Sequence, residues 1–199
     1  MTGAGVMLLA GGRPQASVCT TDEVSSLIEE AQYTLGEGPC VDAHRLGEVV
    51  SEPDLLTAGA SRWVSFSSRA VGAGARAVFG YPVRIGAGQL GALNLYRDRP
   101  GPLDDDEHAN ALVMADVAAR AVLAAQAGAG LGGIGIDLEE DLFVWGAVHQ
   151  AAGMVSVQLD IPVVDALVRL RAHAFLTDRL VSDVASDVVE RRLAFGSDE

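Results

Sequence analysis

The chain has 199 residues, of which 49% are hydrophobic, so it is long enough for one large domain or two small ones. Its net charge of −13 argues against a broad electrostatic contact with nucleic acid, because phosphate contacts require cations. Both parts of the chain are acidic: residues 1–136 hold 15 acidic and nine basic residues, and residues 137–199 hold 12 and five. All 14 basic residues are arginine. This choice either suits bidentate contacts with phosphates and bases or reflects the base composition of the genome.

The sequence shows no signal for a membrane or for secretion. No apolar run approaches the length needed to cross a bilayer, and residues 1–10 lack a basic segment and a cleavage pattern. Two cysteines, Cys19 and Cys40, do not make a disulfide framework. We therefore expect a cytoplasmic protein with no membrane partner.

Residues 1–127 are predicted to form a mixed domain of strands and helices. Strands are expected at 5–10, 16–20, 49–50, 75–85 and 89–96. A first helix begins after Asp22, with Val24, Leu27, Ile28 and Ala31 on its apolar face. Trp63, Phe66 and Ala70 have helical spacing, whereas Cys40 and His44 are expected in a loop. Strands with helices at the edges predict an α+β fold on an antiparallel sheet.

A long helix is predicted from the acidic residues 104–107 to about residue 127, because acids favour the first turn of a helix. Its buried residues are expected to be Leu112, Ala115, Ala119, Val122 and Leu123. Residues 128–136 are rich in glycine and predict a flexible linker.

Three segments of the first domain match the pattern of a known family. Residues 35–40 are Leu-Gly-Glu-Gly-Pro-Cys, residues 62–66 contain Arg-Trp-x-x-Phe, and residues 78–83 are Val-Phe-Gly-Tyr-Pro-Val, followed by Leu-Gly-Ala-Leu-Asn-Leu-Tyr at 90–96. With these segments, residues 1–127 resemble a GAF domain. The resemblance implies an antiparallel sheet with helices on it and a pocket that senses a small molecule, whose identity the sequence does not give, and it names no cofactor.

The expected pocket would be lined by sheet residues and by the segments that cover them. The candidate ligand-binding residues are Trp63, Phe66, Phe79, Tyr81 and Asn94. Each aromatic residue could equally be part of the core. Asn94 is the best polar candidate, because an asparagine among apolar strand residues needs a hydrogen-bond partner.

One feature departs from the GAF pattern. The family usually has a helix before the first strand, beside the long helix that follows the sheet, and here Met1 lies only a few residues before the strand. We expect apolar surface on the sheet or on the helix at 104–127, which a second copy of the chain could cover. A homodimer is therefore expected.

Residues 137–199 predict three short helices. The first carries apolar residues at helical spacing and ends before Pro162, which has no N–H to donate. The second is expected to bury Val163, Leu167, Leu170 and Ala174, and the third, after a break at Thr177 and Asp178, to bury Val181, Val184 and Val188. Helices this short need one another for stability.

The order and spacing of residues in these helices resemble the ANTAR domain. The matching segments are Gln-Ala-x-Gly-Met at 150–154, Ala-x3-Leu-Arg-x2-Ala at 166–174 and Ser-Asp-Val-Ala-x2-Val at 182–188. The resemblance implies a three-helix module that binds hairpin-loop RNA and acts in transcription antitermination. GAF followed by ANTAR is an arrangement of actinobacterial regulators.

The candidate RNA-binding residues are Gln150, Gly153, Arg171 and Arg179. The arginines could contact phosphates or stack on splayed bases, and Gly153 would allow close approach of a backbone. Arg171 could equally form an ion pair with Asp165 or Asp187. The family has lysine where this chain has Ala152, and Phe175 and Leu176 are apolar where the family is more polar.

The sequence shows no enzyme site. The four histidines have no metal-ligand spacing, and both a phosphate-binding loop and a nucleophile elbow are absent. We therefore expect a non-enzymatic regulator that couples small-ligand sensing to RNA binding. Two alternatives stay open: a dimerising sensor whose C-terminal module no longer binds RNA, and a thiol-dependent reductase of the GAF type that uses Cys19 and Cys40.

Overall fold

The computed structural model describes residues 1–11, 13–57, 62–126 and 138–196. The chain divides into two compact units, Met1–Asp137 and Leu138–Glu199. The linker predicted at 128–136 lies outside the described residues.

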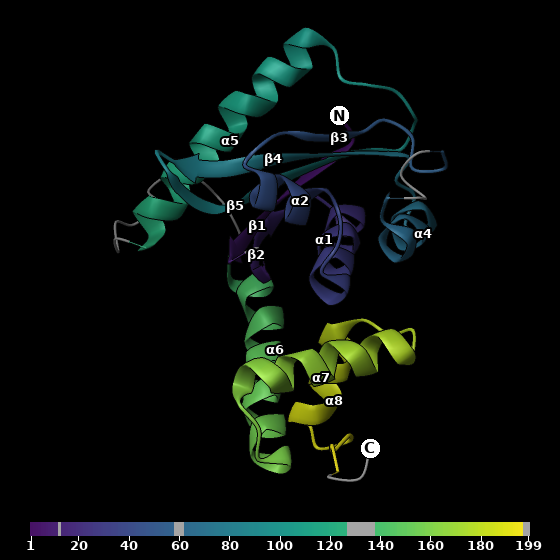
Figure 1. The fold of residues 1–199 in the computed structure, drawn as a ribbon, viewed down its shortest axis with the longest axis vertical. Helices are drawn as coiled ribbons and strands as arrows, with labels where there is room; N and C mark the ends of the chain where they lie inside the picture. Colours follow the sequence, from purple (N-terminus) through teal and green to yellow (C-terminus); the bar gives the residue numbers. More distant parts are fainter. Residues whose placement is uncertain (12, 58–61, 127–137, 197–199) are drawn as a thin grey trace. The chain divides into compact units, whose positions relative to one another are not determined.

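The N-terminal unit is built on a five-stranded antiparallel sheet in the order β2-β1-β5-β4-β3 (Figure 1). Two hairpins meet at its centre, where β1 pairs with β5. The strands are β1 (Gly3–Ala10), β2 (Arg13–Thr20), β3 (Val50–Glu52), β4 (Ala77–Ile85) and β5 (Gly88–Arg97). The predicted antiparallel α+β architecture is confirmed for this unit.

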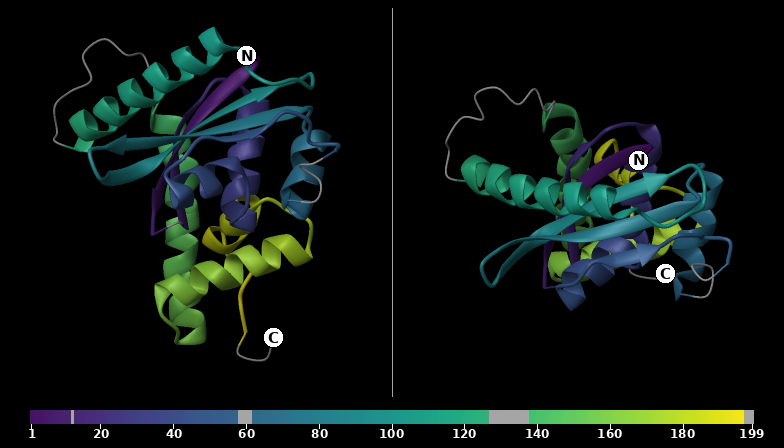
Figure 2. Two further views of the ribbon diagram at one scale, coloured as in Figure 1. Left: turned by 45° about the horizontal axis from the view of Figure 1, so that its top comes forward. Right: turned by 90° about the horizontal axis from the view of Figure 1, so that it is seen from above.

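Helices cover both faces of this sheet. The helices α1 (Glu23–Leu35) and α2 (Pro39–Leu46) lie on one face, and α4 (Val64–Gly72) packs beside α1. The long α5 (Asp105–Gln126) crosses the other face, as both views in Figure 2 show. Asp22 caps α1, because its carboxylate accepts the Ser25 N–H at 2.7 Å.

The hydrophobic core lies between the sheet and α5. Large side chains of β4 and β5 face small side chains of the helix, which lets α5 lie close to the strands. The buried cluster comprises Val6, Ala77, Phe79, Tyr81, Val83, Leu93, Leu95, Ala111, Ala115 and Ala119.

The structure corrects two predictions for this unit. The segment with Cys40 and His44 is the helix α2 and not a loop, and both side chains are buried. On α5, Ala115, Ala119 and Val122 are buried as expected, but Leu112 and Leu123 are 47% and 40% exposed. The side of α5 with the alanines fits against the sheet, so the leucines beside it face outward.

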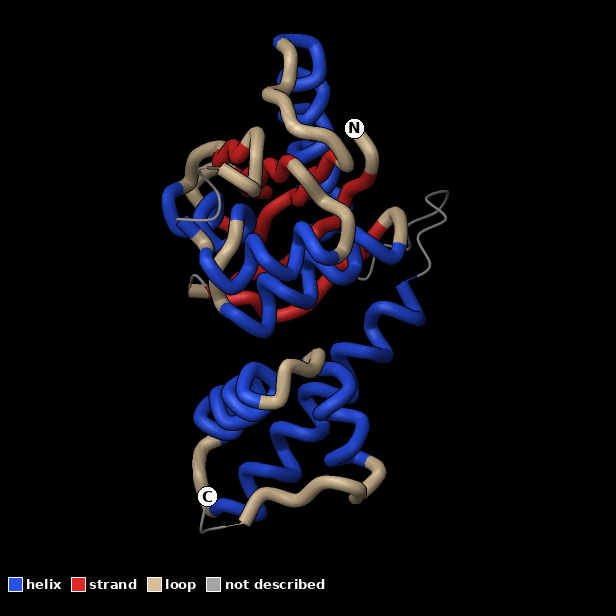
Figure 3. Tube along the Cα trace, turned by 90° about the vertical axis from the view of Figure 1, so that its right-hand side faces the viewer, coloured by secondary structure: helices blue, strands red, loops and turns tan. Residues whose placement is uncertain are grey.

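The C-terminal unit consists of three described helices, shown in Figure 3: α6 (Leu138–Leu159), α7 (Val163–Leu176) and α8 (Val181–Val189). The chain turns by 105° between α6 and α7. Asp160 and Asp178 adopt the left-handed conformation after α6 and α7, with φ of 52° and 51°. The predicted helices are confirmed, while their ANTAR identity stays a prediction.

Small and β-branched side chains form the centre of this unit. The buried residues are Val148, Ala151, Ala152, Val155, Ala166, Leu170, Ala174, Val181, Val184, Ala185 and Val188. On α7 one prediction was wrong: Val163 is 47% exposed, and Ala166 is buried in the turn that follows. Val163 opens the helix directly after Pro162, about one turn before Ala166, the first buried residue of α7.

Among the described residues, the stretch Asp105–Ala125 of α5 is long and apolar enough to cross a bilayer. The bent pair α6 and α7 passes the same test when it is counted as one span. Core helices of globular proteins also meet this criterion, and the buried alanines of α5 pack on the sheet.

Candidate functional site

A row of three residues crosses the centre of the sheet on the face covered by α1 and α2. Asn94 of β5 is paired with Gly5 of β1 on one side and with Gly80 of β4 on the other. Paired residues of an antiparallel sheet share a face, so the asparagine projects between two positions that have no side chain. Asn94 is fully buried.

The amide of Asn94 has no hydrogen-bond partner for either its oxygen or its nitrogen within the described part of the chain. Buried polar groups are nearly always paired, because an orphaned one keeps its desolvation cost. This asparagine therefore offers an NH2 donor group and a carbonyl acceptor, side by side, to an additional group.

Glu29 of α1 occupies the space above Gly5. A β-carbon at Gly5 would overlap the Glu29 carboxylate, so any other residue there would force this buried side chain to move. The Ser17 hydroxyl of β2 donates a hydrogen bond to the same carboxylate, and Glu29 is only 1% exposed. A buried carboxylate therefore lies one strand away from Asn94.

The first turn of α2 occupies the space above Gly80, where a β-carbon would overlap the Pro39 carbonyl. The Cys40 N–H donates to Gln32 Oε1 at 2.7 Å, which joins α1 to α2. The Gln32 amide nitrogen has no partner among the described residues. Asn94, Glu29 and Gln32 form what we call the buried polar cluster.

His44 lies one turn further along α2 and is 4% exposed. Burial lowers its pKa, and a hydrogen bond with the Gly91 backbone opposes that shift. The neutral imidazole is thus the favoured form next to the sheet.

Two of the predicted ligand residues, Trp63 and Phe66, serve to anchor α4. The Trp63 indole N–H donates to Asp42 at 3.1 Å, and the two rings meet edge to face with their centroids 5.8 Å apart. Glu37 accepts the backbone N–H groups of Ser65 and Phe66 at 3.0 and 2.8 Å. Contacts that hold α4 in place therefore account for the residues found around Glu37 and Trp63 in the sequence.

The other two aromatic candidates, Phe79 and Tyr81, lie on the opposite face of the sheet, in the core beneath α5. The Tyr81 hydroxyl hydrogen-bonds with His108 Nδ1 at 2.8 Å. Burial, and then the negative charge of Glu107, raises the pKa of Tyr81. The structure thus does not bring the five predicted residues together, and Asn94 alone belongs to the buried polar cluster.

Neither cysteine forms a disulfide within the described residues, and the two differ in their surroundings. Cys40 is fully buried, and burial raises its pKa, helped by the nearby Glu29 charge. Cys19, on β2, is partly exposed. No cluster of three metal-ligating side chains occurs in the described ranges.

The predicted RNA-binding residues come from three places in the C-terminal unit. Gln150 is exposed on α6, and Gly153 is partly exposed on the same helix. Apart from the neighbouring backbone of α6, no described residue comes within 4 Å of the position that a β-carbon at Gly153 would take, so packing does not require this glycine. Arg171 is partly buried on α7.

Arg179 is engaged within the chain. Its guanidinium binds Asp187 at 2.7 Å, and Arg192 binds the other oxygen of the same carboxylate at 2.7 Å. The hydrogen bonds from Arg179 and Arg192 lower the pKa of Asp187. Asp187, one of the two ion-pair partners considered for Arg171, thus binds Arg179 and Arg192.

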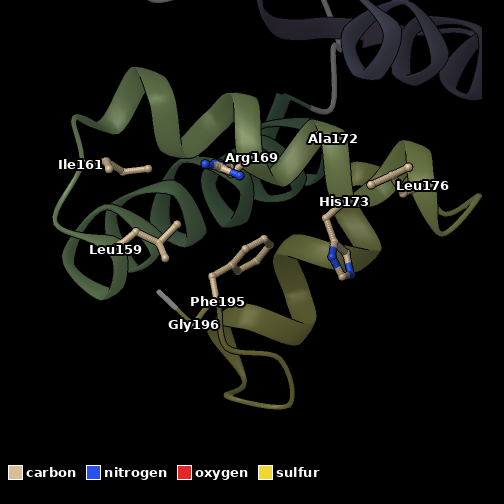
Figure 4. A pocket seen from close by; sticks show the side chains of 8 residues that line it. All are labelled: Leu159, Ile161, Arg169, Ala172, His173, Leu176, Phe195 and Gly196. Atoms are coloured by element: carbon tan, nitrogen blue, oxygen red, sulfur yellow. The ribbon is translucent and has the colours of Figure 1, made fainter. Parts of the chain in front are cut away.

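An open pocket of about 280 Å³ lies between α7 and the C-terminal segment (Figure 4). The Phe195 ring meets the His173 ring with their centroids 5.3 Å apart, and the Phe195 N–H donates to Gln158 at 2.9 Å. Arg169 contributes a guanidinium group to the lining. This pocket could not be predicted from the sequence, because its residues come from separate segments.

No protein-family model and no curated protein matches the chain. Several solved structures resemble it, including the following three. One is a domain assigned to a two-component sensor histidine kinase of Sinorhizobium meliloti 1021, with a TM-score of 0.49 and 22% identity over 64% of this chain and 83% of that one. Another is a type II free methionine-R-sulfoxide reductase of Thermoplasma acidophilum, with a TM-score of 0.47 and 20% identity over 61% and 78%. The third is the GAF domain region of a membrane protein from Geobacter sulfurreducens PCA, with a TM-score of 0.48 and 14% identity over 62% and 82%. At these identities and scores, the likenesses assign no function to the chain.

Proposed function

We propose that the chain is a GAF-like sensor of a small molecule joined to an ANTAR-like module that binds hairpin RNA and regulates transcription antitermination. The sensing half is supported above all by Asn94, a fully buried amide with neither polar atom paired within the described residues. The RNA-binding half is supported by the sequence pattern of residues 150–188 on three helices.

The ligand would bind at the buried polar cluster, where it would form hydrogen bonds with both the nitrogen and the oxygen of the Asn94 amide. Because the cluster is enclosed by α1 and α2, entry requires α2 to move away from the sheet. Ligand binding would then change the populations of two arrangements of the N-terminal unit. We propose that the protein acts as a homodimer and does not catalyse a reaction.

Apolar side chains along α5 supply the surface for the proposed dimer. Val113, Met114 and Val117 are 63%, 48% and 53% exposed on its outer side. Continuous apolar surface of this kind is typical of contact sites. A second copy of α5 in antiparallel orientation would place the acidic first turns of the two helices at opposite ends of the contact, so that they would not repel each other.

A gel-shift assay with a paired-hairpin RNA at low salt tests the RNA-binding half. The wild type should shift the RNA, and Arg171→Glu should abolish the shift while leaving the circular dichroism spectrum unchanged. Arg99→Glu, an exposed arginine of the other unit, is the matched control for charge. Absence of any shift by a dimeric wild type would refute RNA binding.

One observation favours the alternative of a dimerising sensor that does not bind RNA. The outer side of α7 exposes Val164, Val168 and Phe175 at 57%, 54% and 52%, while Arg179 is held by Asp187. An apolar face of this kind is better suited to binding a protein than to binding RNA phosphates, which require cations. Under this alternative the gel shift fails and small-ligand binding by the N-terminal unit persists.

A further inference from the structure

A cavity of about 400 Å³ lies at one edge of the N-terminal sheet, beside α5. Three separate elements bound it: the loop after α2, the second half of β4, and the middle of α5. Its size is within the range of small-molecule sites. Its walls are formed mainly by Glu48, Val49, Pro82, Arg84, Leu112 and Asp116.

The sheet leaves this space because β3 is short. It pairs with Val78–Gly80 only, so beyond Gly80 that side of β4 has no strand within the described residues. Pro82 stands at this open edge, where a residue without an N–H is tolerated. The ladder with β5 also shifts its register between Val83 and Arg84. The edge of β4 is therefore available to a ligand.

Opposite charges line the cavity from different elements. Arg84 comes from β4, Glu48 from the loop after α2, and Asp116 from α5. No ion pair joins Arg84 to either carboxylate in the part of the chain that the structure describes. Asp116 binds Arg120 at 2.9 Å and remains 58% exposed, so its carboxylate is accessible.

The remaining walls are apolar. Val49 and Pro82 are partly buried, and Leu112 is 47% exposed although it lies next to the core residue Ala111. An apolar side chain that entered the cavity would remove this leucine surface from water, which is favourable in proportion to the area covered.

We propose that this cavity binds a free α-amino acid with an aliphatic side chain. Arg84 takes the carboxylate, because a guanidinium can donate two parallel hydrogen bonds to it. Glu48 and Asp116 take the ammonium group, and Leu112 contacts the side chain of the ligand. The bound amino acid would tie β4 to α5.

This inference goes beyond the proposed function, which places the sensed ligand beside Asn94. The residues that line the cavity include none of Asn94, Glu29 and Gln32, so substitutions can test the two sites separately.

Isothermal titration calorimetry of the full chain with L-leucine tests the proposal. One equivalent should bind, and N-acetyl-L-leucine and L-leucinamide, which lack the ammonium and the carboxylate charge, should each bind about ten-fold or more weakly. Arg84→Gln, and Glu48→Gln combined with Asp116→Asn, should weaken L-leucine binding to a similar extent. Arg99→Gln and Asp106→Asn, which replace exposed charges outside the cavity, should leave it unchanged.

Three results would overturn the proposal. The first is no heat of binding at millimolar L-leucine, L-valine or L-isoleucine. The second is N-acetyl-L-leucine binding as tightly as L-leucine, which would indicate a simple anion site. The third is loss of L-leucine binding in Asn94→Val with retention in Arg84→Gln, which would place the ligand at the buried polar cluster and leave the proposed sensing function standing.

Discussion

Replacement of Asn94 by valine separates a ligand-binding role from a structural one. Both polar atoms of the Asn94 amide are buried without a partner among the described residues. An orphaned buried polar group costs about 1–3 kcal/mol. Valine supplies a β-branched side chain that suits the centre of a sheet, so Asn94→Val should stabilise the ligand-free protein by about 1–3 kcal/mol.

The assay is thermal and urea unfolding followed by circular dichroism. For a unit of this size, the expected gain corresponds to a rise of roughly 3–5 °C in Tm per kcal/mol. Asn110→Val, on the exposed side of α5, should change stability by less than about 0.5 kcal/mol. A loss of stability above about 1 kcal/mol in Asn94→Val would refute the reasoning, because it would mean that the amide is already satisfied in the folded protein.

Four further predictions concern neighbouring features. Gly5→Ala should destabilise the protein by about 1–3 kcal/mol in urea unfolding, because its β-carbon would overlap the Glu29 carboxylate; an unchanged midpoint would contradict this packing. Cys40 should react with iodoacetamide at pH 8 far more slowly than Cys19, because burial raises its pKa, and equal rates would show that the thiol is accessible. Val117→Glu should shift the protein toward monomer in analytical ultracentrifugation, whereas the matched Asp116→Glu should not. Burial lowers the pKa of His44 from 6.5, so below about pH 6.5 the unfolded chain binds a proton that the folded chain does not. The free energy of unfolding should therefore fall as the pH drops below about 6.5, and it should fall less in His44→Gln.

The strands and most helices followed from the sequence, because their apolar residues repeat with a clear period. The helix α2 did not, since its buried side includes Asp42 and His44, and a polar buried face has no hydrophobic periodicity. For α5 the helical period was predicted correctly, but the predicted buried face wrongly included the leucines. In the structure Ala111, Ala115 and Ala119 pack on the sheet, and Leu112 is exposed.

The candidate site could be predicted only in part for a similar reason. Asn94 stood out as a polar residue in an apolar strand, but Glu29 occupies what the sequence presents as an ordinary charged position on a helix. What decides its burial is Gly5, which is distant in sequence and leaves room for the carboxylate. The aromatic candidates could not be assigned to a face without the strand register, which places Phe79 and Tyr81 beneath α5.

The charges of the C-terminal unit determine what kind of RNA contact is open to it. Asp187 holds Arg179 and Arg192, so releasing either cation to a phosphate would cost an ion pair. The sterically open position at Gly153 and the exposed Gln150 on α6 favour hydrogen bonds and close approach instead. RNA binding through that face should therefore depend only weakly on salt. The binding constant should fall by about one to two log units for each tenfold rise in salt concentration. A steeper slope in a salt series of gel shifts would mean that several arginines leave their partners to bind RNA.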